Sequence, residues 1–136
     1  MKILKQDKQK LIEFLMKCSS LDDLLNILLN ICENLDLNFK NNFKKLKKFQ
    51  FTYFGLIVKV KGLLRMIIFK IEFLRKIWNE LDVFYLELLK LNELVDEIYE
   101  LIKNEKLSQG MEKLIECSKK YNLLFTRIKP LVLKKI

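Results

Sequence analysis

Apolar residues recur at alternating spacings of three and four from position 43 to position 88, and this register restricts the possible folds more than any other feature of the sequence. The spacing is typical of helices that bury one face along their whole length. Gln50 is the one polar member of the series. The apolar members are Phe43, Leu46, Tyr53, Ile57, Val60, Leu64, Ile67, Ile71, Leu74, Trp78, Leu81, Tyr85 and Leu88. The register therefore predicts long packed helices.

The chain achieves this pattern without a single alanine among its 136 residues. Alanine is the strongest intrinsic helix former and one of the commonest residues in proteins. Arginine (3 residues), glycine (3) and proline (1) are also scarce, whereas lysine is abundant (23). The depleted residues have GC-rich codons, so the composition indicates an AT-rich genome, such as that of an organelle, a reduced parasite or endosymbiont, or a virus.

The apolar side chains exceed what one core needs. They make up 51% of the chain, and all are larger than alanine. A core-facing helix has about three apolar positions in seven, so a helical chain of this length needs roughly 50 and has about twenty more. The surplus predicts a further interface with a partner. The alternative is that drift in composition has placed apolar residues on a solvated surface.

Turn-forming residues divide the chain into five expected helices within a single domain, residues 1–136. Ser20-Leu21-Asp22-Asp23 has the spacing of a capping box, and Asn79 is positioned to cap a later helix. Asparagines predict a loop at about 36–41. Pro130 is expected to end the last helix and leave a basic, apolar tail at 131–136. The expected helices are Ile3–Cys18, Leu21–Asn34, 42–78, 80–104 and Ser108–Ile128.

The expected fold class is all-α, an up-and-down bundle of four or five helices with a long helical hairpin. One alternative stays open at positions 49–60. This segment also alternates, is rich in β-forming residues and contains Gly55. A helical bundle with a short β-hairpin at 49–60 is therefore the second interpretation.

The residue types argue against an enzyme. The chain has no histidine, and Cys18, Cys32 and Cys117 are isolated among apolar residues, so zinc ligation and nucleophile–base chemistry are poorly supported. We interpret the cysteines as reduced core residues, with a Cys18–Cys32 bridge as the lesser alternative. The three glycines stand alone, which excludes a glycine-rich phosphate loop. We expect no catalytic residues, no metal, no cofactor and no small-molecule substrate.

Charge is the feature that carries functional information. The net charge is +10 over residues 40–76 and +5 over 105–136, but −5 over 77–104. Such asymmetry favours a polyanionic partner, because lysines neutralise phosphates and aromatic residues stack on unpaired bases. The candidate phosphate-binding residues are Lys44, Lys45, Lys47, Lys48, Lys59, Lys61, Arg65, Lys134 and Lys135.

The function we expect is that of a small, basic, non-catalytic subunit of a larger ribonucleoprotein, such as an organellar or reduced ribosome. RNA would be contacted through its backbone, because the scarcity of arginine disfavours base-specific readout. The N-terminus lacks the apolar run of a signal peptide, and charges interrupt the apolar stretch Phe51–Leu74. We expect an intracellular protein, with a mitochondrion or plastid as candidate compartments.

Two other functions remain open at the level of the sequence. A helical protein-interaction module, such as a viral or parasite effector, could bind a partner helix in an apolar groove. A peripheral subunit of an organellar membrane complex could lie with Phe51–Leu74 at an anionic membrane surface.

Overall fold

Helices account for nearly all of the part of the chain that the structure, a computed structural model, describes: residues 5–33 and 43–136. Within these ranges the α-helices are α1 (Lys5–Glu33), α2 (Phe43–Leu74), α3 (Asp82–Lys103) and α4 (Leu107–Lys135), with a short 3-10 helix, η2 (Asn79–Leu81). The all-α prediction is confirmed. The alternative of a hairpin at 49–60 is wrong, because this segment lies inside α2. The loop expected at 36–41 falls outside the described residues.

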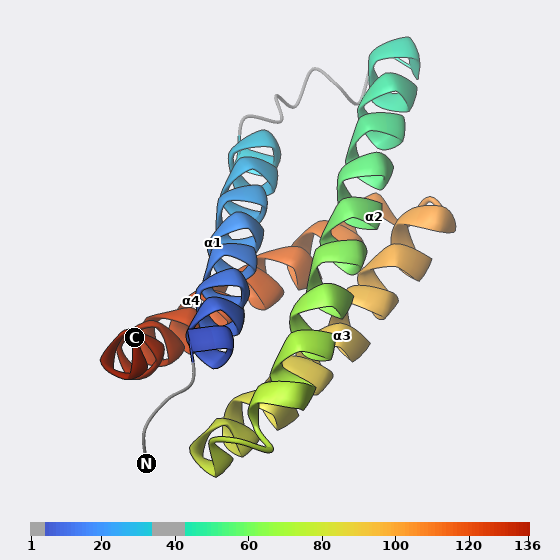
Figure 1. Cartoon of the computed structure of the whole chain (residues 1–136). Coiled ribbons are helices and arrows are strands. Elements are labelled where there is room, and N and C mark those ends of the chain that lie inside the picture. Colours follow the sequence, from blue (N-terminus) through green and yellow to red (C-terminus); the bar gives the residue numbers. More distant parts are fainter. Residues whose placement is uncertain (1–4, 34–42) are drawn as a thin grey trace.

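The helices form a ring in which each packs on two neighbours. Helix α1 contacts α2 and α4, and α3 contacts the same two helices from the other side. Successive helices alternate in direction, and α4 runs obliquely behind the others (Figure 1). The helices therefore have the expected up-and-down topology, and the start of α1 and the end of α4 lie at the same end of the bundle (Figure 1).

The core is built from one buried stripe on each helix. On α2 the buried residues follow the predicted three-and-four register from Tyr53 to Leu74, and beyond α2 the register holds at Leu81 in η2 and at Leu88 in α3. Trp78 and Tyr85 of the predicted series are only half-buried, and Phe84 is buried in place of Tyr85. Burial of one such leucine or isoleucine side chain contributes about 1.5–3 kcal/mol, so the stripes supply most of the driving force. The side chain of Tyr121 on α4 also reaches across this core to α1, where its hydroxyl donates a hydrogen bond of 2.5 Å to the carbonyl oxygen of Cys18.

The N-terminal region differs from the prediction, because α1 is one helix and not two. Ser20 does not cap a new helix; its Oγ donates to the carbonyl oxygen of Met16, one turn earlier, at 3.0 Å. The buried stripe continues through the serines by way of Cys18 and Leu21. Packing of a continuous stripe outweighs the weak tendency of serine to end a helix. Cys18 and Cys32 lie about 21 Å apart on this helix, so no bridge joins them.

The predicted break at Asn79 lies close to the turn between α2 and α3, but α2 ends at Leu74 and not at 78. Asn79 does not act as a cap; the chain turns at Trp78, which is extended (φ −126°, ψ 99°), and enters η2. Arg75 closes this turn, since its Nε lies 3.5 Å from Asp82 Oδ1 and its guanidinium carbon lies 4.1 Å from the centroid of the Tyr85 ring.

The C-terminal region also differs, because α4 passes through Pro130 and continues to Lys135. Proline fits the φ of a helix and costs stability mainly through its missing N–H and ring. Pro130 lies on the exposed side, while Ile128 and Val132 are buried on the other side of the same turns. Packing of these two residues holds the last turns in place, so the expected tail at 131–136 is largely helix.

Candidate nucleic-acid interface

The side of α2 that faces away from the bundle is the candidate interface, and we call it the outer face of α2. Its members are exposed and recur at helical spacing opposite the buried stripe, so they lie along one broad strip of the helix surface. From Phe51 to Phe69 this strip is on the order of 27 Å long. The outer face of α2 comprises Lys47, Lys48, Phe51, Gly55, Val58, Lys59, Gly62, Arg65, Met66 and Phe69.

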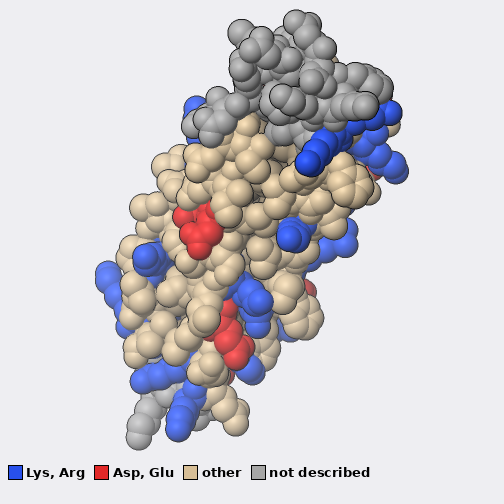
Figure 2. Space-filling model, turned by 90° about the horizontal axis from the view of Figure 1, so that it is seen from above, with Lys and Arg blue, Asp and Glu red and all other residues tan. Residues whose placement is uncertain are grey.

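Positive charge on this face is not offset by acids of its own helix. The chain has no Asp or Glu from position 37 to position 71, so the first acid of α2 is Glu72. Lys48, Lys59 and Arg65 extend into solvent at intervals along the helix. On the side of the molecule shown in Figure 2, Lys and Arg likewise occupy several separated positions, with uncharged surface and some acidic patches between them. A polyanion would therefore be contacted along a line and not in one deep basic pocket.

Two aromatic side chains stand out from this face. Phe51 is 82% exposed and Phe69 is 77% exposed, which is unusual for phenylalanine. Their neighbours behave differently: Tyr53 is buried, and the Phe54 ring packs 5.1 Å from the ring of Tyr99 on α3. The face thus combines exposed cations with exposed aromatic rings, the combination used to bind single-stranded nucleic acids.

Two of the three glycines also lie on the outer face of α2. A Cβ built on Gly55 or Gly62 would have nothing within 4 Å, so neither glycine is required by internal packing. Glycine in the middle of a helix costs about 0.5–1 kcal/mol relative to alanine. At these positions the helix backbone can be approached closely from outside, between the cations.

Lys61 does not belong to this face, although the sequence grouped it with Lys59 and Arg65. Its Nζ lies 3.0 Å from Asp96 Oδ1 on α3 and 4.2 Å from the centroid of the Tyr99 ring. Only 19% of its side chain is exposed. Lys61 therefore joins two helices of the bundle and is poorly placed to contact a phosphate.

The two C-terminal candidates lie at the other end of the molecule. Lys135 forms an ion pair with Glu80 at the turn between α2 and α3, and the hydrogen bond from Lys135 lowers the pKa of that carboxyl. Its Nζ also lies 5.5 Å from the centroid of the Trp78 ring. Lys134 is exposed. Because Lys47 and Lys48 lie near the start of α2, the two groups of lysines do not form one site.

Lys44 and Lys45 lie in α2, but their side chains fall outside the described residues. Sequence reasoning did not identify Val58, Met66 or Phe69 as surface residues. Their signal was present, since all three lie outside the register of the buried stripe and project to the opposite side of the helix.

Ionisable groups inside the bundle are held in their neutral forms. Burial raises the pKa of the Cys18 and Cys117 thiols to about 12 and raises the pKa of Tyr53 and Tyr121 above their ordinary value. Such thiols are poor nucleophiles. Among the described residues, no group of three Cys, Asp or Glu side chains is arranged to hold a metal ion. No helix within the described ranges is long and apolar enough to span a bilayer.

Comparisons of the chain with protein-family models, with curated proteins and with solved structures found no match.

Proposed function

We propose that the protein is a non-catalytic subunit of a larger ribonucleoprotein assembly and that it contacts RNA through the outer face of α2. The observation that carries the proposal is the joint exposure of Lys48, Lys59 and Arg65 with Phe51 and Phe69 on a helix face without acids. Cations at these intervals neutralise phosphates, and the sequence-independent part of RNA affinity comes from this neutralisation.

The exposed phenylalanines support single-stranded RNA over a duplex. Bases in an A-form helix are stacked on one another, whereas unpaired bases are free to stack on aromatic side chains. Such stacking contributes about 1–3 kcal/mol per base and tolerates any sequence. Gly55 and Gly62 support close approach of the RNA backbone between the two rings, because no side chain covers the helix there.

The test is binding of a fluorescently labelled single-stranded RNA over a series of salt concentrations. The triple variant Lys48→Gln, Lys59→Gln, Arg65→Gln should bind more weakly, and its slope of log affinity against log salt should fall by about 2, since each phosphate contact contributes roughly 0.7. The matched control replaces three exposed cations elsewhere, Lys103, Lys106 and Lys119, with glutamine. Equal losses in the two triple variants, or no binding by the wild type at low salt, would contradict the proposal.

The aromatic part is tested separately with Phe51→Ala and Phe69→Ala. Both side chains are exposed, so the free energy of unfolding should change by less than about 0.5 kcal/mol. Affinity for single-stranded RNA should fall, while affinity for double-stranded RNA should not. A parallel loss with both RNAs would remove the stacking argument.

A second candidate function is supported by the same exposed apolar residues. A face with Phe51, Val58 and Phe69 flanked by cations is also typical of a helix that lies on an anionic membrane surface. Sedimentation with vesicles of anionic phospholipid distinguishes the two functions. Binding to these vesicles that Phe51→Ala and Phe69→Ala abolish, without RNA binding, would favour a peripheral subunit of a membrane complex.

A further inference from the structure

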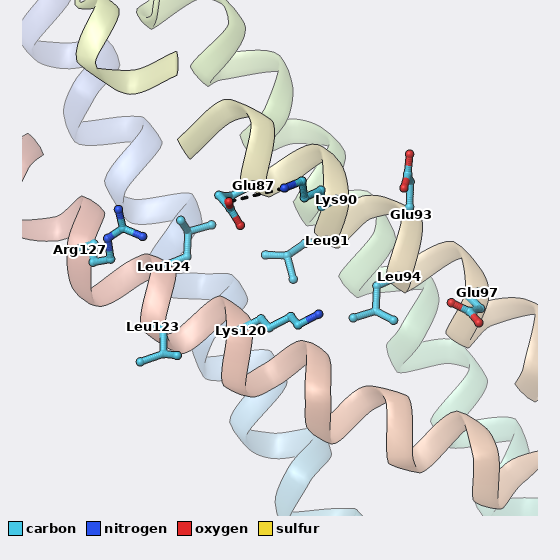
Figure 3. Close-up of a pocket in the computed structure, with 10 residues that line it drawn as sticks. All are labelled: Glu87, Lys90, Leu91, Glu93, Leu94, Glu97, Lys120, Leu123, Leu124 and Arg127. Carbon is cyan, nitrogen blue, oxygen red and sulfur yellow. Dashed lines mark ion pairs between the residues drawn. The ribbon is translucent and has the colours of Figure 1, made fainter. Parts of the chain in front are cut away.

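A groove runs between α3 and α4, on the side of these two helices that faces away from α1 and α2 (Figure 3). Its volume is about 520 Å³. The floor is apolar: Leu91 and Leu94 point from α3 toward α4, and Leu124 points into the same space from α4 (Figure 3). Its lining residues span 87–97 on α3 and 120–127 on α4, so the groove is elongated along the two helices and fits an elongated partner better than a small molecule.

The two banks of the groove carry opposite charge. The α3 bank has Glu87, Glu93 and Glu97 with one lysine, Lys90, whereas the α4 bank has Lys120 and Arg127. The formal charges of the banks are therefore equal in size and opposite in sign. Among the described residues, neither Glu93 nor Arg127 takes part in an ion pair. The arrangement leaves a negative and a positive group available to an occupant.

Large apolar side chains on the two helices are left in solvent beside the groove. Leu123, which lines the groove on the α4 side, is 67% exposed, and Leu86 on α3 is 56% exposed. Exposed leucines next to an apolar groove are typical of a helix-packing surface that lacks its partner. The occupant must present apolar side chains in the middle, positive charge toward α3 and negative charge toward α4.

The same groove on a second copy of the chain meets this description. We propose that the protein forms a two-fold symmetric dimer in which α3 and α4 of one copy pack on α4 and α3 of the other. A two-fold axis parallel to the helices places each acidic bank opposite a basic bank. An axis perpendicular to the helices would place α3 on α3, acid against acid, and the charges disfavour it.

The alignment of α3 with α4 within one molecule shows that the opposed charges lie at the same height along the helix axes. Lys113 Nζ lies 2.8 Å from Glu97 Oε1, so these residues are level across the α3–α4 pair. Because the helices are antiparallel, Lys120 is level with position 90, between Glu87 and Glu93. Rotation about an axis parallel to the helices does not change the height of any residue along that axis, so Lys120 of one copy and position 90 of the other remain at the same height. Lys120 of each copy therefore meets the turn between Glu87 and Glu93 of the other.

The dimer is compatible with the proposed RNA contact and independent of it. Helix α2 packs on α1 and α3, and its outer face is not part of the groove. Both outer faces remain open in the dimer, so one assembly would present two RNA-binding faces. Failure of the dimer would leave the RNA proposal unaffected, and the reverse also holds.

Sedimentation equilibrium of charge-reversal variants tests the proposal. The variant Glu87→Lys, Glu93→Lys has two basic banks, and the variant Lys120→Glu, Arg127→Glu has two acidic banks. Each alone should raise the dimer dissociation constant by roughly tenfold to a hundredfold. An equimolar mixture of the two should form a heterodimer, and the chain with all four changes should recover the homodimer.

The matched control reverses two exposed charges of the same helices outside the groove, Glu100→Lys and Lys119→Glu, and should leave dimerisation unchanged. Circular dichroism confirms that each variant is folded. A wild type that stays monomeric up to about 1 mM would overturn the proposal. So would a dimer that neither reversal weakens, or a monomer whose groove instead takes up an amphipathic helix from another protein.

Discussion

Lys61 on α2 and Asp96 on α3 are joined across the helix interface, with 3.0 Å between Nζ and Oδ1. The ammonium also lies 4.2 Å from the centroid of the Tyr99 ring, so one lysine makes two interhelical contacts. Two positions earlier, Lys59 faces solvent on the outer face of α2. Neighbouring lysines of one helix therefore have different roles, one in stability and one at the surface.

Substitution of these two lysines should separate the roles. Lys61→Met should lower the free energy of unfolding by about 1 kcal/mol, because it removes a partly screened ion pair and a cation–π contact. Lys59→Met should change it by less than about 0.5 kcal/mol but weaken RNA binding. Chemical denaturation and RNA titration of both variants provide the measurement. A reversed pattern would show that Lys61 faces the ligand.

Tyr121→Phe should destabilise the bundle without altering its surface. The Tyr121 hydroxyl is buried and donates to the carbonyl oxygen of Cys18 on α1. Loss of one buried hydrogen bond costs about 0.5–1.5 kcal/mol, measured as a shift in the denaturant midpoint. Tyr85→Phe is the control, since this half-buried ring contacts Arg75 through its face and not through its hydroxyl. Equal effects of the two variants would refute the hydrogen-bond explanation.

Glu105→Gly should stabilise the protein. Glu105 lies two residues beyond the end of α3, with φ 62° in the left-handed region, and Lys106 N–H donates to the Leu101 carbonyl oxygen at 2.8 Å. This pattern is a Schellman motif, whose left-handed position favours glycine, and a non-glycine residue there costs about 1 kcal/mol. The melting temperature should therefore rise. No increase would mean that the Glu105 side chain compensates for the backbone cost.

Alanine at the glycines should have opposite effects in two places. Gly62→Ala fills open space on an exposed helix and should stabilise by about 0.5–1 kcal/mol. At Gly110, a Cβ would lie 2.9 Å from Cγ1 of Ile102, where α4 packs against the end of α3. Gly110→Ala should therefore destabilise by about 1–3 kcal/mol, the usual cost of overpacking. Thermal unfolding of both variants tests the contrast, and stabilisation by both would show that Ile102 moves freely.

Alkaline conditions should destabilise the fold. The pKa of Cys18 and of Cys117 is about 12 in the folded protein and 9.0 for an ordinary thiol. Since the folded pKa is raised, the stabilisation is fully present below pH 9 and is lost as the pH rises from there toward 12. Each thiol then contributes a loss of about 1.4 kcal/mol per pH unit.

Urea denaturation at pH 8 and pH 10 measures this loss. Cys117→Ala, which removes one of the two thiols, should reduce the loss of stability between pH 8 and pH 10 by about 1.4 kcal/mol, the contribution of one thiol over this range. Stability that stays constant over this range would mean that the thiols ionise as easily in the folded protein as in the unfolded chain.

The prediction of the core succeeded because it depended on local geometry. Spacing alone places Tyr53, Ile57 and Leu88 in one register, and all three are buried, whereas Trp78 and Tyr85 of the same series are only half-buried. The helix ends were predicted less well. Ser20 and Pro130 were expected to stop helices, yet each lies within a continuous helix because buried residues on the other side of the same turns hold the backbone in place.

The sequence by itself determined the helical class and the side of each helix that faces the core, because side chains three and four residues apart always share one face. Tertiary structure decided which charged residues are available. Lys61 and Lys135 are largely unavailable to a partner molecule, because each forms an ion pair with an acid distant in the sequence, Asp96 and Glu80 respectively. It also created the groove between α3 and α4. These features arise only when separate helices meet, since an ion pair or a groove depends on two surfaces and their register.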